Sequence, residues 1–184
     1  MGVSGRRMNE ARMGNLPMMD EYEQITIRLA HMINYLSKRV TPQRDMSRVD
    51  RAPERGEWSV RQIVAHLRDT EARVYPKLFA IANYDFPDLR ELPPPIVTTD
   101  NQEISIFTVM SQFRRLRQST LSLLRALPDD AWIRAGTDID NRTVTIRDLA
   151  LSLQTHDAEH LAQIDQTLIA RDALPHHVTP LVLS

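Results

Sequence analysis

Residues 145–168 read TIRDLALSLQTHDAEHLAQIDQTL, and their apolar side chains recur at the three- and four-residue spacing of one helix face. Thr145 is placed to cap this helix, with Asp148 three residues further on. The apolar stripe consists of Ile146, Leu149, Leu153, His156, His160, Ile164 and Leu168. Two histidines therefore stand where leucine or isoleucine is expected. The stretch predicts a long amphipathic helix with two imidazoles on its core-facing side.

Three further amphipathic stretches precede this one along the chain. The first covers residues 17–39, and the second follows a capping box formed by Ser59 and Gln62, with Pro76 expected to kink or interrupt it. We expect the third to be capped at Asp100, with Glu103 three residues on, and to end before Pro128. Long polar connections, 42–57 and 85–101, separate the helices. The prediction is an all-α four-helix bundle of residues 17–184, preceded by a flexible leader at 1–16.

The composition excludes several classes of protein. The 184 residues include 23 basic and 24 acidic side chains, so the basic excess of a nucleic-acid-binding domain is missing. Arg114, Arg115 and Arg117 cluster locally, and we interpret them as a solvated helix face. No apolar run is long enough to span a membrane, and no secretory signal is evident. Cysteine is absent, which excludes disulfides and thiolate ligands and suits a cytoplasmic location.

The histidine pair allows two interpretations. Residues four apart on a helix lie on the same face, so His156 and His160 could converge on one metal ion, or they could be hydrogen-bonded core histidines. His66, at the edge of the second helix's stripe, could complete a three-histidine site with open positions. Residues 156–160 also spell the H-x-x-E-H motif of inverted zinc peptidases. Only 24 residues follow His160, and they hold no acid well placed as a further ligand, so we discount the peptidase.

Three motifs together resemble the DinB-like superfamily. They are WSVRQIVAHL at 58–67, TVTIRD at 143–148 and HDAEHLAQI at 156–164. This superfamily includes bacillithiol-type S-transferases and mycothiol-dependent maleylpyruvate isomerases. The resemblance implies a four-helix bundle, a homodimer, and a divalent metal on His66, His156 and His160. It also implies a low-molecular-weight thiol as co-substrate, which fits a chain without cysteine.

The function predicted in this way is metal-dependent thiol S-transfer to a small molecule, and the alternative is a non-enzymatic, stress-associated metal-binding dimer. Histidine ligands suit zinc or nickel, with iron and manganese as further options. Asp69 and Asp157 could orient the imidazoles, although we favour surface helix charge as the role of both. Arg61 and Arg73 could bind a carboxylate of the substrate or thiol. The third helix also suggests dimerisation, because five of its apolar residues cannot all face a single core: Ile104, Ile106, Phe107, Val109 and Met110.

Overall fold

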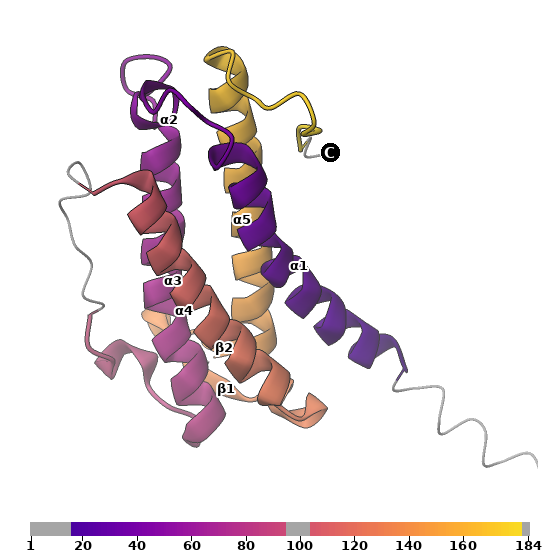
Figure 1. Cartoon of the computed structure of the whole chain (residues 1–184). Coiled ribbons are helices and arrows are strands. Elements are labelled where there is room, and N and C mark those ends of the chain that lie inside the picture. The colour runs from indigo at the N-terminus through magenta and orange to yellow at the C-terminus, as the bar shows by residue number, and fades with distance from the viewer. Residues whose placement is uncertain (1–15, 95–103, 182–184) are drawn as a thin grey trace, which may run out of the picture.

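The computed structural model describes residues 16–94 and 104–181 and has four long helices, which confirms the all-α four-helix bundle (Figure 1). The helices are α1 (Leu16–Val40), α3 (Val60–Asn83), α4 (Ile106–Ala126) and α5 (Ile146–Ala170). Apart from Leu16, with which α1 begins, the predicted leader lies outside the described residues. Within the described ranges, none of the helices is long and apolar enough to cross a membrane.

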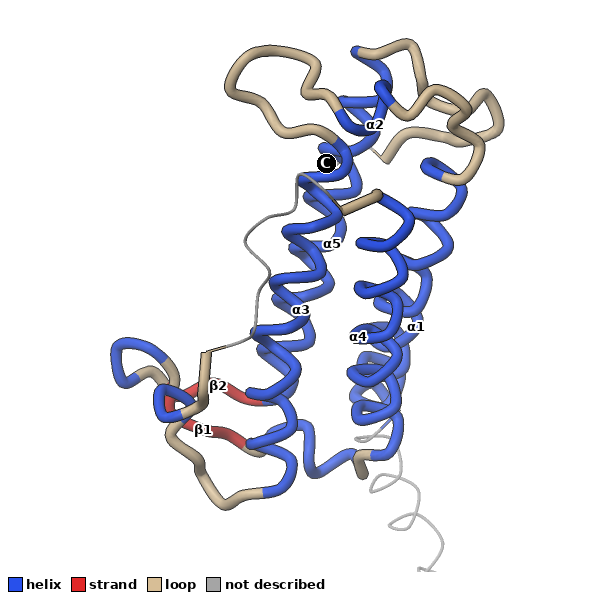
Figure 2. Tube along the Cα trace, turned by 60° about the vertical axis from the view of Figure 1, so that its left-hand side comes forward, coloured by secondary structure: helices blue, strands red, loops and turns tan. Residues whose placement is uncertain are grey.

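The order of the helices around the bundle is α1, α4, α3, α5, and each helix packs against the next in this ring. Side-chain contacts give the directions. Gln112 and Arg117 of α4 meet Arg68 and Glu71 of α3 in the same order, so these two helices run parallel. The end of α3 and the start of α4 therefore lie at opposite ends of the bundle (Figure 2).

The helix starts agree with the capping residues in two of three cases. Ser59 with Gln62, and Thr145 with Asp148, form capping boxes at α3 and α5. The expectation for the third helix was wrong about its first residue: α4 begins at Ile106, with Ser105 as its cap. Asp100 and Glu103 lie outside the described residues.

Pro76 does not interrupt α3, which continues to Asn83. A proline removes one backbone donor from the helix. The turns on both sides of it are anchored by burial, with Leu67 and Leu78 in the core, and this packing keeps the helix continuous.

Short elements cover the two ends of the bundle. At one end lies α2 (Ser47–Asp50), and at the other a small hairpin pairs β1 (Ala135–Thr137) with β2 (Thr143–Thr145) in antiparallel register (Figures 1 and 2). Three one- to two-turn 3-10 helices lie at Leu89–Glu91, Asp129–Ile133 and Ile139–Asn141. The sequence pattern predicted no strand in this part of the chain. The amide of Thr137 donates to Pro87 O at 2.9 Å, so the hairpin also holds the start of the α3–α4 connection.

A polar layer divides the core into two apolar halves. One half gathers around Phe113 and Leu36, and the other around Leu29, Leu78 and Trp132. Between them, four buried polar side chains come from three helices: Glu71, Arg117, Thr120 and Asp157. The interpretation of the α4 arginines as a solvated face was therefore wrong for Arg117, which has no exposed surface.

The apolar side chains at the start of α4 can share one core after all. Ile106, Val109 and Met110 are buried, and Ile104 packs against the same cluster just before the helix. Only Phe107 among these five residues turns outward, with 48% of its surface exposed. The reason given for a homodimer therefore does not hold, and dimerisation itself stays a prediction.

Candidate metal centre

Three histidines from two antiparallel helices meet at the middle of the bundle. His66 of α3 and His156 and His160 of α5 each offer a ring nitrogen, and these three atoms all lie within 4.8 Å of one another. Nε2 of His66 is 2.9 Å from Nε2 of His156. All three side chains are half-buried, so the cluster sits at the edge of the core and not within it. The structure thus brings together the three residues that the sequence singled out.

The spacing of these nitrogens fits a shared ion. Nitrogens that bind one tetrahedral ion at about 2.1 Å lie about 3.4 Å from one another, close to the arrangement here. The alternative, in which the three residues are hydrogen-bonded core histidines without a metal, explains this geometry less well. Only one hydrogen bond joins the three rings, and the buried Nδ1 of His156 has no hydrogen-bond partner among the described residues.

The environment keeps the imidazoles of His66 and His156 neutral, which is the form that binds a metal. Burial, together with His160 and His66 nearby, lowers the pKa of His156 to about 4. Burial also lowers the pKa of His66, and the charges of His160 and Arg73 act in the same direction. Near neutral pH, His66 and His156 therefore offer their nitrogen lone pairs to a metal without first losing a proton.

A glutamine orients one of the rings. Gln163, one turn after His160, places its Oε1 2.8 Å from Nδ1 of His160. A proton on Nδ1 donates to this oxygen and leaves Nε2 as a free lone pair facing the other two histidines. Sequence reasoning missed Gln163, although its spacing of three residues on the same helix was a usable signal.

Trp58 covers one side of the cluster. Its ring lies 5.2 Å from the ring of His66 and stacks on His160 at 6.2 Å, measured between centroids. It immediately precedes Ser59, the cap of α3, so the capping box that starts this helix also fixes the position of the indole. The aromatic face limits the directions from which water reaches the histidines.

The two aspartates proposed to orient the imidazoles bond to arginines. Asp69 is paired with Arg68 at 2.6 Å, and Asp157 is paired with Arg117 in the polar layer. Residues adjacent on a helix point about 100° apart, so Asp157 faces the bundle interior while His156 faces the cluster. Among the described residues, neither carboxylate has a hydrogen bond to an imidazole.

The two candidate arginines and the glutamate of the H-x-x-E-H spelling lie in different places relative to the histidines. Arg61 lies 3.3 Å from Asp50, whereas Arg73 is exposed on the same face of α3 as His66, two turns further along. Glu159, the glutamate of the H-x-x-E-H spelling, is exposed and lines a groove on the α1 side of α5. It is therefore on the wrong side of the helix to serve a metal at the histidines, which argues against the peptidase.

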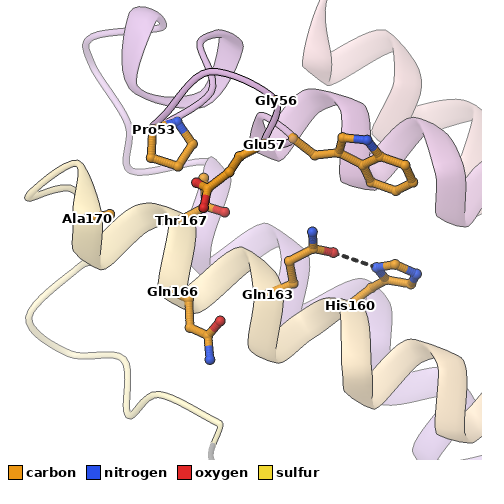
Figure 3. Close-up of a pocket in the computed structure, with 9 residues that line it drawn as sticks. Pro53, Gly56, Glu57, His160, Gln163, Gln166, Thr167 and Ala170 are labelled. Atoms are coloured by element: carbon orange, nitrogen blue, oxygen red, sulfur yellow. Dashed lines mark hydrogen bonds between the residues drawn. The ribbon is translucent and has the colours of Figure 1, made fainter.

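A cavity of about 600 Å³ adjoins the cluster at His160 (Figure 3). One wall comes from the loop before α3 and the other from the last turns of α5. Its lining consists of Pro53, Gly56, Glu57, Trp58, His160, Gln163, Gln166, Thr167 and Ala170. The volume suits a small molecule, and one candidate ligand lies directly at its edge.

Comparison with known proteins agrees with this arrangement. A family model described as the DinB superfamily matches residues 28–164. Among solved structures, the chain is similar to YfiT from Bacillus subtilis, described as a probable metal-dependent hydrolase with an unusual four-helix bundle topology. The TM-score is 0.69 at 21% sequence identity, over 82% of this chain and 87% of that one. No match to a curated protein was found.

Proposed function

The chain belongs to the DinB superfamily, and we propose that it is a metal-dependent enzyme that transfers a small thiol to an electrophilic small molecule. The observation that carries the proposal is the convergence of three imidazoles beside a cavity of small-molecule size. A divalent ion held by three neutral ligands keeps its positive charge and lowers the pKa of a thiol or water that shares it.

In this proposal each residue of the site has its own role. His66, His156 and His160 hold the ion, and Gln163 fixes the ring of His160 through Nδ1. Trp58 shields the ion from bulk water, and the cavity beside His160 holds the electrophile. In the overall reaction a sulfur–carbon bond forms as the bond from carbon to its leaving group breaks. The proton of the thiol departs with the leaving group.

Zinc and nickel are the ions we propose first, since both bind imidazole well, with iron and manganese as alternatives. Hydrolysis is a second candidate. It is favoured by the description of the similar YfiT structure as a probable metal-dependent hydrolase, and by the same three-histidine geometry, which suits activation of water. The two reactions differ only in the nucleophile.

Metal analysis of the purified protein tests the proposal first. We expect about one divalent ion per chain, and its loss in His156→Ala, because two remaining imidazoles form a much weaker chelate. The control is His176→Ala, an exposed histidine outside the cluster. The bundle has its own core, so His156→Ala should keep its helical circular dichroism spectrum.

Activity is then screened with monochlorobimane as the electrophile and cysteine or glutathione as the thiol, with and without chelator. p-Nitrophenyl acetate without any thiol tests hydrolysis. Thiol-dependent turnover that chelator and His156→Ala both abolish supports the transferase, and thiol-independent turnover with the same sensitivity supports the hydrolase. Metal-free wild-type protein whose melting temperature does not respond to added zinc or nickel would overturn both. Sedimentation at micromolar concentration tests the predicted homodimer.

A further inference from the structure

The cavity beside His160 has a distinctive charge. None of its nine lining residues is lysine or arginine, and Glu57 is its only carboxylate. The remaining polar groups are the amides of Gln163 and Gln166, the hydroxyl of Thr167, the indole N–H of Trp58 and the imidazole of His160. An anion entering this cavity would give up water without gaining a cationic side chain as partner, and it would meet the carboxylate of Glu57.

The amide of Gln163 has a defined orientation in this cavity. Its oxygen accepts the hydrogen bond from Nδ1 of His160, as required if Nε2 of His160 is to face the ion. Its NH2 group is then left over as a donor. Figure 3 shows this nitrogen turned away from His160, toward the side on which Glu57 lies. Among the described residues, the side chain makes no other hydrogen bond.

A donor fixed in this way selects for an acceptor. A ligand that covers this N–H group displaces the water it faces and leaves it unpaired unless it supplies an acceptor, so a ligand that offers a carbonyl oxygen gains an advantage over one that offers none. The adjacent indole of Trp58, with 40% of its surface exposed, offers a flat apolar surface for the rest of the molecule. These features define a class of ligand: it has a carbonyl acceptor and an apolar or aromatic body, and it carries no negative charge.

We infer that the substrate held in this cavity carries no negative charge and offers a carbonyl-type acceptor, which Gln163 positions beside His160. The inference rests on the proposed function for the role of the cavity, and it deepens that function by naming a substrate class. Gln163 is then a positioning residue with two contacts: it orients a metal ligand through its oxygen and the substrate through its nitrogen.

Three probes of nearly equal size test the inference: benzamide, benzoate and benzylammonium. Their dissociation constants are measured on chelator-treated protein by NMR titration, so that no ion can bind benzoate directly. We expect benzamide to bind and to shift the side-chain amide signal of Gln163, and benzoate to bind at least tenfold more weakly. Benzylammonium should bind through Glu57 and Trp58 and leave the Gln163 signal almost unchanged.

Matched variants separate the two contributions. Gln163→Leu should weaken benzamide at least tenfold, whereas Gln154→Leu, on the same helix but outside the cavity, should leave it unchanged. Glu57→Gln should strengthen benzoate at least threefold. Equal affinities for benzoate and benzamide, an unchanged affinity in Gln163→Leu, or no binding of any probe would overturn the inference. Because the titrations contain no metal, these outcomes are independent of the test of the metal-dependent enzyme.

Discussion

Replacing Arg117 with methionine should destabilise the protein more than any change at an exposed arginine. Arg117 donates to Glu71 Oε2 at 2.7 and 3.0 Å, to Asp157 Oδ1 at 3.0 Å, and to the carbonyl of Leu29 at 3.1 Å. It thereby ties α4 to α1, α3 and α5. Methionine keeps much of the length but none of the donors, so two carboxylates stay buried without their cation.

The expected loss follows from this geometry. Removing one partner of a buried ion pair costs about 3–5 kcal/mol, because the remaining charge is left uncompensated. For a chain of this size each kcal/mol lowers the melting temperature by about 2–4 °C, so the drop should be about 6–20 °C. The matched control is Arg114→Met on the same helix. Arg114 is exposed and has one long contact, 3.4 Å to Ser37, so its loss should stay within about 0.5 kcal/mol.

Urea unfolding of metal-free protein, followed by circular dichroism, measures both variants. The destabilisation of Arg117→Met should be larger at pH 8 than at pH 5. Burial raises the pKa of Asp157, and the loss of Arg117 removes the charge that opposes this shift. The Asp157 carboxyl of the variant therefore binds a proton on folding, and the variant loses stability as the pH rises. Adding Glu71→Gln and Asp157→Asn should recover more than half of the loss. If Arg117→Met lost no more than Arg114→Met, or the triple variant recovered nothing, the polar layer would not be held together by charge.

Three further results are expected. Hydrogen bonds from the Thr145 hydroxyl and backbone hold the pKa of Asp148 below its usual value, so this capping box contributes stability above about pH 4 that is lost as the pH falls further. Urea midpoints of wild type and Asp148→Asn should therefore converge at low pH. Gly136→Ala should cost about 1–3 kcal/mol in thermal unfolding, since its Cβ would lie 2.7 Å from Pro87 O. In Gly56→Ala a backbone φ of 92° should cost about 1 kcal/mol, although no atom lies near its Cβ.

Periodicity was sufficient to predict the helices of the bundle, because each buries one continuous stripe of side chains. The histidines could be predicted for the same reason: His156 and His160 interrupt such a stripe. The hairpin could not, since its strands have only three residues each and show no usable alternation. The start of α4 was misplaced because Asp100 and Ser105 both have the chemistry of a cap, and only packing decides between them.

The polar layer shows where reasoning from one helix at a time fails. Arg117 lies four residues after Phe113 and four before Leu121, at a stripe position of α4, yet three arginines in a short stretch suggested a solvated face. Glu71 and Asp157 likewise occupy stripe positions of α3 and α5. Each charge seen alone looks like a surface residue, because its partner is 40 or more positions away in sequence.

When the helices are considered together, Arg117, Glu71 and Asp157 lead to a different prediction: a buried polar layer. An arginine in the stripe of one helix requires carboxylates in the stripes of its neighbours, since a lone buried charge is too costly to keep. The layer that results holds two carboxylates and one guanidinium, a formal charge of −1. Asp157 adjoins His156, so this charge lies directly behind the three histidines. The layer therefore fixes α3 and α5 side by side behind the histidines, although among the described residues neither Asp157 nor Glu71 has a hydrogen bond to an imidazole.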